Sequence, residues 1–421
     1  MSHIHKTPEP STGSLSRRTA FLRATTLVLG ATLGYPSRGS EPDPIRLMSW
    51  KLEVDPVDGR SIRRFAGRAA PTEILTDPET GVRVRIRDLF PGRAAPFPID
   101  DRLQLGDGGW GLRCVDRAGM GLSPSHDNAA WAMNMIPFGV LLDGSIIDPS
   151  GPWYDGGAAD PRNPFDRSCT GWEYEVMHPA VSAVVGIPAA IPGHVQPSGM
   201  FHYHGYPALL VAALRDHARA TGRHGGPLLL GFSADGFPIL DHRWRESRDG
   251  HRHFRFSSYV LRDGPREALP LTNPERPPPG AFDGLFVQDY AFDPQRKRAR
   301  IEAALERGET YCGLTARDMR LGRASYALLD RYNGGFFREL EGYGGDVWGY
   351  ALTPDWPMIP RLFAFEPDIS FRNIIPFEAR RSAALGRISR ALGLNPGRRA
   401  LYDNCPASLQ DMRAWHGRPR Y

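Results

Sequence analysis

Glycine and proline interrupt this chain along its whole length, and they limit the secondary structure that it can form. The 421 residues include 46 Gly and 39 Pro, and both types are spread through the sequence. Glycine allows the backbone conformations of tight turns, and proline cannot continue a helix or a central strand. We therefore expect many turns, short strands and few long helices.

The remaining composition is that of a folded protein. Apolar residues make up 41% of the chain, including 9 Trp, 14 Tyr and 20 Phe, which favours a packed globule over disorder. The chain is long enough to bury a large core. Together with the turn-rich pattern, this predicts a mainly β (β-rich α+β) fold, a single large domain of short antiparallel strands with peripheral helices.

The charge pattern does not indicate a nucleic-acid-binding protein. The formal net charge is +5, and Lys6, Lys51 and Lys297 are the only lysines among 52 basic residues. Nucleic-acid-binding surfaces usually combine basic clusters with aromatic residues. The sequence has no long basic run with interleaved aromatics, so we expect no nucleic-acid partner.

Residues 1–40 have the features of an export signal of the twin-arginine type. Arg17 and Arg18 precede an apolar run at 24–34, which is too short to span a bilayer. A charged region followed by a short apolar run is typical of a secretory signal. We expect export to the periplasm or the extracellular space, with no transmembrane span beyond this segment. A disordered tail and an uncleaved anchor are the alternatives.

The four cysteines do not indicate a structural zinc site. Cys114, Cys169, Cys312 and Cys405 are far apart and none belongs to a C-x-x-C pair, the spacing typical of zinc knuckles. One or two disulfides remain open for an exported protein.

Hydrophobic periodicity divides the body of the chain, residues 41–378, into short elements. Strand patterns occupy the segments 82–87, 136–150 (around an Asp143-Gly144 turn), 172–177, 225–240, 251–264 and 346–352. The clearest helix pattern covers 206–222, a charged helical insert covers 294–327, and an Arg-rich helical tail covers 379–421.

The stretch "GMFHYHGYP" places His202 and His204 two residues apart. Alternate side chains of a strand share one face, so both imidazoles are expected on one side, with Phe201 and Tyr203 on the other. His194 precedes them in "GHVQP", and the intervening Pro-Ser-Gly predicts a turn. A hairpin of 193–196 with 201–204 would bring the three histidines together, which is a ligand set for zinc or copper with an open position.

Asp235, in "SADGFP", is the candidate carboxylate for this site. It is expected to be a ligand, to orient a ligand imidazole, or to act as general base to a bound water. The alternative is ordinary Asp-Gly turn chemistry. Glu173 and Glu175 are a second source of carboxylates, for which a solvated strand face is favoured. His251 and His253 repeat the His-x-His spacing and are interpreted as an exposed strand.

Several segments in order resemble the YHYH-domain family. They are "FGVLLDGSIIDP", "WEYEVM", "PGHVQPSGMFHYHGYPALL" and "LLGFSADGFPIL", and the likeness extends over residues 137–371. Phe201 stands where the family signature has its first Tyr, Leu240 replaces another Tyr, and Arg331-Tyr332 stand where many members have Glu-Cys. The resemblance implies a fold and a histidine site more than a reaction.

Common catalytic motifs are missing from the sequence. "GFSADG" departs from the nucleophile elbow, and there is no H-E-x-x-H, no Walker-type G-K-[ST] and no G-x-G-x-x-G. We expect an exported protein that binds a divalent metal, zinc or copper, through His194, His202 and His204. An enzyme of this kind would catalyse metal-assisted hydrolysis or copper redox chemistry. The alternatives are a non-catalytic module that binds a small molecule or metal, and a structural histidine cluster.

Overall fold

The computed structural model of the protein describes residues 45–373, apart from 91–98, 101, 107–108, 126–130, 133–135, 152–171, 197–198, 224, 247–249 and 270–278. The predicted signal segment (1–40) and helical tail (379–421) lie outside the described residues, as do Cys169 and Cys405. All described elements belong to the unit formed by residues 44–421.

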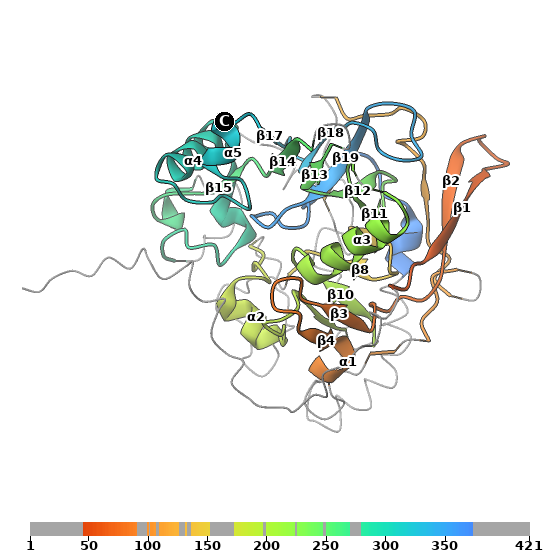
Figure 1. Ribbon diagram of the computed structural model, residues 1–421. Coiled ribbons are helices and arrows are strands. Elements are labelled where there is room, and N and C mark those ends of the chain that lie inside the picture. The colour runs from red at the N-terminus through yellow and green to blue at the C-terminus, as the bar shows by residue number, and fades with distance from the viewer. Residues whose placement is uncertain are drawn as a thin grey trace, which may run out of the picture. The chain divides into compact units, whose positions relative to one another are not determined.

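Short strands dominate the described part of the chain, as the glycine and proline pattern predicts (Figure 1). The strands are β1 (Ser49–Val54), β2 (Ser61–Ala66), β3 (Ile74–Thr76), β4 (Arg83–Arg85), β5 (Arg113–Val115), β6 (Trp131–Ala132), β7 (Gly139–Leu141), β8 (Ile146–Ile147), β9 (Gly193–Val195), β10 (Phe201–Tyr203), β11 (Leu229–Ser233), β12 (Pro238–Asp241), β13 (Arg243–Arg245), β14 (Arg252–Phe256), β15 (Tyr259–Leu261), β16 (Tyr290–Phe292), β17 (Ala324–Leu328), β18 (Gly334–Phe337), β19 (Val347–Leu352) and β20 (Leu362–Phe363). The predicted mainly β class is confirmed.

Helices are few and mostly short. The α-helices are α1 (Ile86–Leu89), α2 (Pro179–Val185), α3 (Ala208–Ala220), α4 (Pro294–Glu306) and α5 (Ala316–Arg320), and the 3-10 helices are η1 (Arg266–Ala268), η2 (Val287–Asp289) and η3 (Ile369–Asn373). Figure 1 shows α4 and α5 beside β15 and β17, which they contact. The positions of α4 and α5 therefore agree with the predicted peripheral helices.

One large sheet organises the described residues. Its eight strands run in the order β18-β19-β12-β11-β7-β8-β10-β9. Five of the neighbouring pairs are antiparallel, but β12 pairs with β19, and β8 with β10, in parallel. The smaller sheets are β1-β2-β5, β13-β14-β17, β15-β16, β20-β6 and β3-β4. The strand β9 lies at one edge of the large sheet, which places the segment "GHVQP" there.

Most of the predicted elements are confirmed. The turn at Asp143-Gly144 joins β7 to β8, α3 falls within 206–222, and the segment 225–240 forms β11, a turn and β12. These elements were predictable because each carries its own local signal, a turn dipeptide or a helical apolar stripe.

Three predicted elements differ from the structure. The strand expected at 82–87 ends at Arg85, and α1 begins at Ile86, which is buried. The segment 172–177 is not a strand and makes only an isolated bridge between Tyr174 and Phe286. The segment 294–327, which is expected to be a helical insert, is helical only in α4 and α5. Its last residues form β17, which pairs with β14. Pairing with a distant strand overrides the local helix pattern here.

Aromatic side chains hold the core against the large sheet. Phe138 is fully buried, stacks on Phe363 at 5.2 Å between ring centroids, and meets the Tyr350 ring edge-on at 4.8 Å. Aromatic pairs of this geometry add about 0.5–1.5 kcal/mol beyond their buried area. The core therefore ties the centre of the sheet to the segment around β20.

Two further findings concern the length of the helices and the state of the cysteines. No helix in the described part of the chain is long and apolar enough to cross a membrane. Cys114 is buried and Cys312 is half-buried, and both are free thiols. A disulfide between these two cysteines is therefore not formed.

Replacement of Phe138 by Ala is expected to lower the free energy of unfolding by about 3–5 kcal/mol, because it leaves a cavity among fully buried rings. Urea unfolding of both proteins measures the difference. Val57→Ala is the control, since Val57 is 92% exposed. Similar, small effects for both variants would contradict the assigned core.

Candidate metal site

The two histidine segments form the predicted hairpin. β9 and β10 pair antiparallel, and His194 lies directly opposite His202. Gly199 has a φ of 85° in the turn, and its amide donates to the carbonyl of Gln196 at 2.8 Å. A Cβ at Gly193 would lie 2.4 Å from the carbonyl oxygen of His202, so only glycine allows the strands to approach this closely. The local sequence thus builds the hairpin and brings two histidines together.

The strand β10 separates an aromatic face from a histidine face. Phe201 and Tyr203 are buried in the main core, with their rings edge-on at 4.9 Å. His204 follows the strand, and its amide donates to the carbonyl of Pro192 at 2.8 Å. This bond keeps His204 on the same side as His202, as the alternation of a strand predicts.

The three imidazole rings converge through their Nε2 atoms. The Nε2 atoms of His202 and His204 lie 2.8 Å apart, and those of His204 and His194 lie 3.1 Å apart. One ligand atom from each residue lies within 4.8 Å of the other two, and these three residues are the one such metal-type group among the described residues. The side-chain nitrogen of Gln196 lies 3.5 Å from Nε2 of His202.

The hydrogen bond of His194 determines which of its nitrogens carries the hydrogen. Nδ1 of His194 lies 2.7 Å from the carbonyl oxygen of Val185, at the end of α2. A carbonyl oxygen only accepts, so Nδ1 carries the hydrogen and Nε2 presents a lone pair to the cluster. Such a bond commonly orients histidines that bind metals.

The neutral cluster has too few hydrogens for its contacts. Nε2 of His204 touches Nε2 of both His194 and His202, and a neutral His204 carries at most one hydrogen there. That hydrogen can point at only one of the two neighbours. If Nε2 of His204 carries no hydrogen, its lone pair faces the lone pair on Nε2 of His194. A metal cation accepts one lone pair from each of three imidazoles at once, so this donor set fits a metal better than it fits a hydrogen-bonded cluster.

Burial keeps the three imidazoles neutral. It lowers the pKa of His194, against the effect of its backbone hydrogen bond. Burial also lowers the pKa values of His202 and His204 well below their usual range, and the neighbouring histidines lower them further. Neutral imidazole is the form that binds a metal. His202 and His204 are buried and His194 is half-buried, so the cluster is not sealed from solvent.

The structure does not bring Asp235 into this cluster. Its carboxylate accepts hydrogen bonds from Ser233 Oγ at 2.5 Å, from the Tyr350 hydroxyl at 2.6 Å and from the amide of Phe365 at 3.1 Å. Burial raises its pKa, although these bonds act in the opposite direction. Asp235 thus joins the turn between β11 and β12 to the segment after β20, which is closer to the turn-chemistry alternative than to a catalytic role.

Glu175 is buried and Glu173 is half-buried, so the solvated face expected for them is wrong. Arg361 pairs with Glu175 and lies 3.4 Å from Glu173 (Nη1 to Oε1). The guanidinium also donates to the carbonyl of Pro149 at 2.6 Å, just after β8, and its charge lowers the pKa of His204. The two carboxylates and Arg361 therefore form a largely buried ionic group near the histidine cluster. Sequence reasoning missed Arg361 because it is 186 residues from Glu175.

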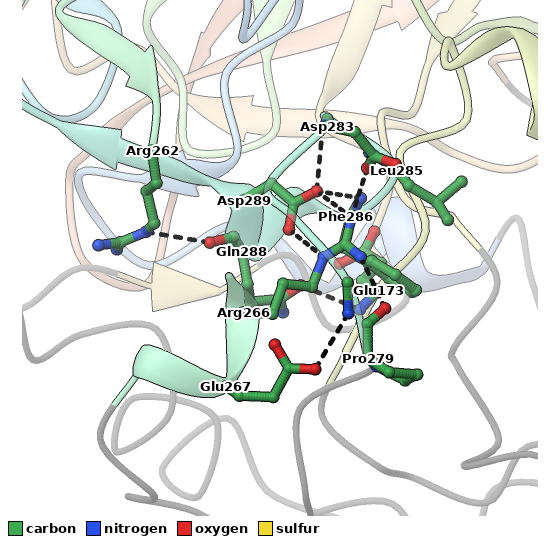
Figure 2. A network of polar contacts seen from close by, with 12 residues as sticks. Glu173, Arg262, Arg266, Glu267, Pro279, Asp283, Leu285, Phe286, Gln288 and Asp289 are labelled. Carbon is green, nitrogen blue, oxygen red and sulfur yellow. Dashed lines mark hydrogen bonds and ion pairs between the residues drawn. The ribbon is translucent and has the colours of Figure 1, made fainter. Parts of the chain in front are cut away.

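A second ionic group positions the segment that carries these carboxylates (Figure 2). Arg266 makes two bonds to Asp289, at 2.7 and 2.8 Å, and also pairs with Asp283. These contacts hold the loop that leads into η2. The amide of Glu173 donates to the side chain of Gln288 at 3.1 Å, and the amide of Val287 donates to the carbonyl of Glu173 at 2.9 Å. The 172–177 segment is thus fixed by this loop and not by a strand ladder.

The fold and the hairpin define a β-rich protein with a three-histidine cluster at the edge of its main sheet. Residues 118–364 match the family model described as "YHYH protein". The match covers more than half of the chain, so the chain belongs to the YHYH family, as its resemblance over 137–371 indicates. No curated protein and no solved structure matches it.

The pH dependence of stability tests the buried carboxylates. Burial raises the pKa of Glu173 to about 7 in the folded protein, against the opposing effects of Arg361 and the Gly151 amide. The folded state then binds more protons than the unfolded state between about pH 4.5 and 7, so this residue makes stability fall as pH rises through that window. Glu173→Gln, which stays neutral, is expected to lose this decline.

Denaturant unfolding at about pH 5 and about pH 8 measures this effect. The difference in the free energy of unfolding between Glu173→Gln and the native sequence is expected to favour the variant more at the higher pH than at the lower. Glu267→Gln is the control, because Glu267 lies at the surface. An unchanged difference between the two pH values for Glu173→Gln would contradict the assignment.

Proposed function

We propose that this YHYH-family protein binds a divalent transition metal through Nε2 of His194, His202 and His204. The observation that carries the proposal is the convergence of three neutral imidazoles with too few hydrogens for their contacts. The hydrogen bond from His194 to the backbone and the burial of His202 and His204 support it further.

The proposed donor set suits zinc or copper. Zinc in catalytic sites commonly has three protein ligands and one open position. Three imidazoles also suit copper, which the ligand set alone does not separate from zinc. When bound, zinc would lower the pKa of a water molecule, and copper would supply one-electron chemistry. His194 is half-buried whereas His202 and His204 are buried, so a small-molecule ligand would reach the open position from the His194 side.

The protein would serve either as a metal-dependent enzyme or as a metal- or ligand-binding module. An open fourth position favours the enzyme, whereas a fourth protein ligand would favour the binding module. Glu173 and Glu175 would supply carboxylates in place of Asp235, which is held by its own hydrogen bonds.

Metal analysis of the purified protein tests the proposal. The native sequence is expected to retain about one zinc or copper per chain, and His202→Ala/His204→Ala is expected to retain almost none. His217→Ala, in α3, is the matched histidine control and should retain the metal of the native sequence. Near-zero metal in all three proteins, after zinc and copper have each been supplied, would contradict metal binding and favour a purely structural role for the histidine cluster.

A stability measurement separates loss of binding from loss of fold. Metal at 100 times its dissociation constant is expected to stabilise the native sequence by about 2.7 kcal/mol. The double variant should fold without metal and gain no stability from it. Equal stabilisation of both proteins would place the metal elsewhere.

We also propose that the protein is exported through the segment 1–40. Arg17→Lys/Arg18→Lys is expected to retain the protein inside the cell, because the arginine pair is the defining feature of the twin-arginine signal. Cell fractionation measures the distribution, and Arg23→Lys is the control. Normal export of the double variant would contradict this signal type.

A further inference from the structure

A second cluster of polar side chains lies on the small sheet β13-β14-β17, outside the histidine site. The central strand β14 places His253 opposite Trp244 of β13 and opposite Ser325 of β17. Residues that are directly paired across strands share one face of a sheet. His251 precedes the strand by one residue and lies two residues from His253, and Glu246 follows β13 directly.

These side chains form a continuous chain of contacts. Nε2 of His253 lies 2.6 Å from a carboxylate oxygen of Glu246, and Nδ1 of the same ring lies 3.1 Å from Oγ of Ser325. The order hydroxyl, imidazole, carboxylate is that of a serine nucleophile with its base and its orienting acid. Nε2 of His251 also lies 3.1 Å from Oγ of Ser325.

The hydrogens of this cluster can be assigned from its acceptors. The carbonyl of Gly322 lies 3.0 Å from Nδ1 of His251, so that nitrogen carries the hydrogen and Nε2 accepts. The Glu246 carboxylate accepts from Nε2 of His253, which leaves Nδ1 as an acceptor in the neutral ring. The hydroxyl of Ser325 therefore faces two acceptor nitrogens with a single hydrogen. Nδ1 of His253 can therefore accept the hydroxyl hydrogen of Ser325, as a general base does.

The His253 ring is held in place and kept neutral. It stacks on Trp244 with 4.9 Å between ring centroids and 16° between planes. Burial lowers the pKa of His253 while the Glu246 carboxylate raises it, and His251 and Arg255 lower it further. A stacked neutral imidazole can take the hydroxyl hydrogen of Ser325 without changing its position.

A cationic cavity adjoins the cluster. It has a volume of about 610 Å³ and is lined by Arg245, Gly250, His251, Arg252, Asp318, Gly322 and Arg323. Arg252 pairs with Asp318, the one carboxylate among the described lining residues. The three guanidinium groups against one carboxylate give the described lining an excess of positive charge, and His251 joins it to the Ser325 hydroxyl. Arginine is the side chain best suited to carboxylate and phosphate groups.

We propose that Ser325, His253 and Glu246 form an active site, separate from the histidine cluster, that hydrolyses esters carrying a negatively charged group. Ser325 is the nucleophile, His253 is the general base, and Glu246 is a positioning residue that orients the imidazole. The cationic cavity binds the charged part of the ester. Since the site lies on another sheet, its activity does not depend on the histidine metal site.

The reaction balances with water as the only co-reactant. His253 takes the hydroxyl hydrogen as Ser325 Oγ attacks the carbonyl carbon, and the ester C–O bond breaks. The alcohol leaves with the proton from His253. Water then attacks the acyl-serine, gives one hydrogen to His253, and releases the carboxylic acid while Oγ regains its hydrogen.

Labelling with a reporter-bearing fluorophosphonate tests the nucleophile in the full chain. We expect covalent modification at Ser325, located by mass spectrometry of peptides, and no modification of Ser325→Ala. His253→Gln is expected to slow labelling by about 10²- to 10⁴-fold. Ser182→Ala, which removes a hydroxyl from α2, is the matched control and should label normally. Circular dichroism checks that the variants fold.

Three further measurements assign the remaining roles. Glu246→Gln is expected to slow labelling and to move its pH midpoint to lower pH, because Glu246 stabilises protonated His253. Among the described residues, His251 and Arg255 are the other charged or titratable groups that face the ring. Arg323→Gln is expected to reduce the preference for 4-nitrophenyl hemisuccinate over 4-nitrophenyl acetate. His202→Ala/His204→Ala treated with EDTA should label like the native sequence.

The proposal is overturned if the folded native sequence is not labelled, or is labelled at a residue other than Ser325. It is overturned equally if Glu246→Gln and His253→Gln label at the native rate, since the cluster would then only join the strands. Loss of labelling in the EDTA-treated double variant would contradict the independence of the two sites.

Discussion

The antiparallel pairing of β9 with β10 is the constraint on which the histidine site depends. The pairing places His194 opposite His202, and His204, two residues after His202, completes the cluster on the same face. Since a shift of one residue would turn the histidines to the other face of the sheet, the register has to be fixed. Phe201 and Tyr203 fix it, because their burial in the main core admits one register only.

Buried charges extend this constraint to segments without strand structure. Arg361 holds Glu173 and Glu175 near the histidines, while Arg266 and Asp289 hold the loop to which the carboxylate segment is bonded. A buried charge that loses its partner costs several kcal/mol, so such groups restrict the chain to one arrangement. The surroundings of the histidine cluster are thus fixed by ion pairs where the sheet ends.

The sequence predicts the parts of the site that are local and misses those that are distant. The hairpin follows from the alternation around His202 and from the turn at Gly199, both readable within ten residues. Glu173 and Glu175 are shielded from solvent because they pair with Arg361, nearly two hundred residues away. The local sequence pattern of a charged strand is the same whether its carboxylates face solvent or form ion pairs. The sequence indicates Asp235 through its carboxylate and its place in the segment "SADGFP". Its hydrogen bonds to Tyr350 and Phe365 depend on tertiary packing that no local pattern reveals.

X-ray absorption spectroscopy at the metal edge tests the central claim most directly, because it identifies the atoms around the metal. For the metal-loaded native sequence we predict three imidazole nitrogens at about 2.0–2.1 Å, together with one oxygen ligand at the open position if the metal is zinc. A first shell containing sulfur, or one with the same number of imidazoles in His202→Ala/His204→Ala, would contradict the assignment of His194, His202 and His204 as the ligands.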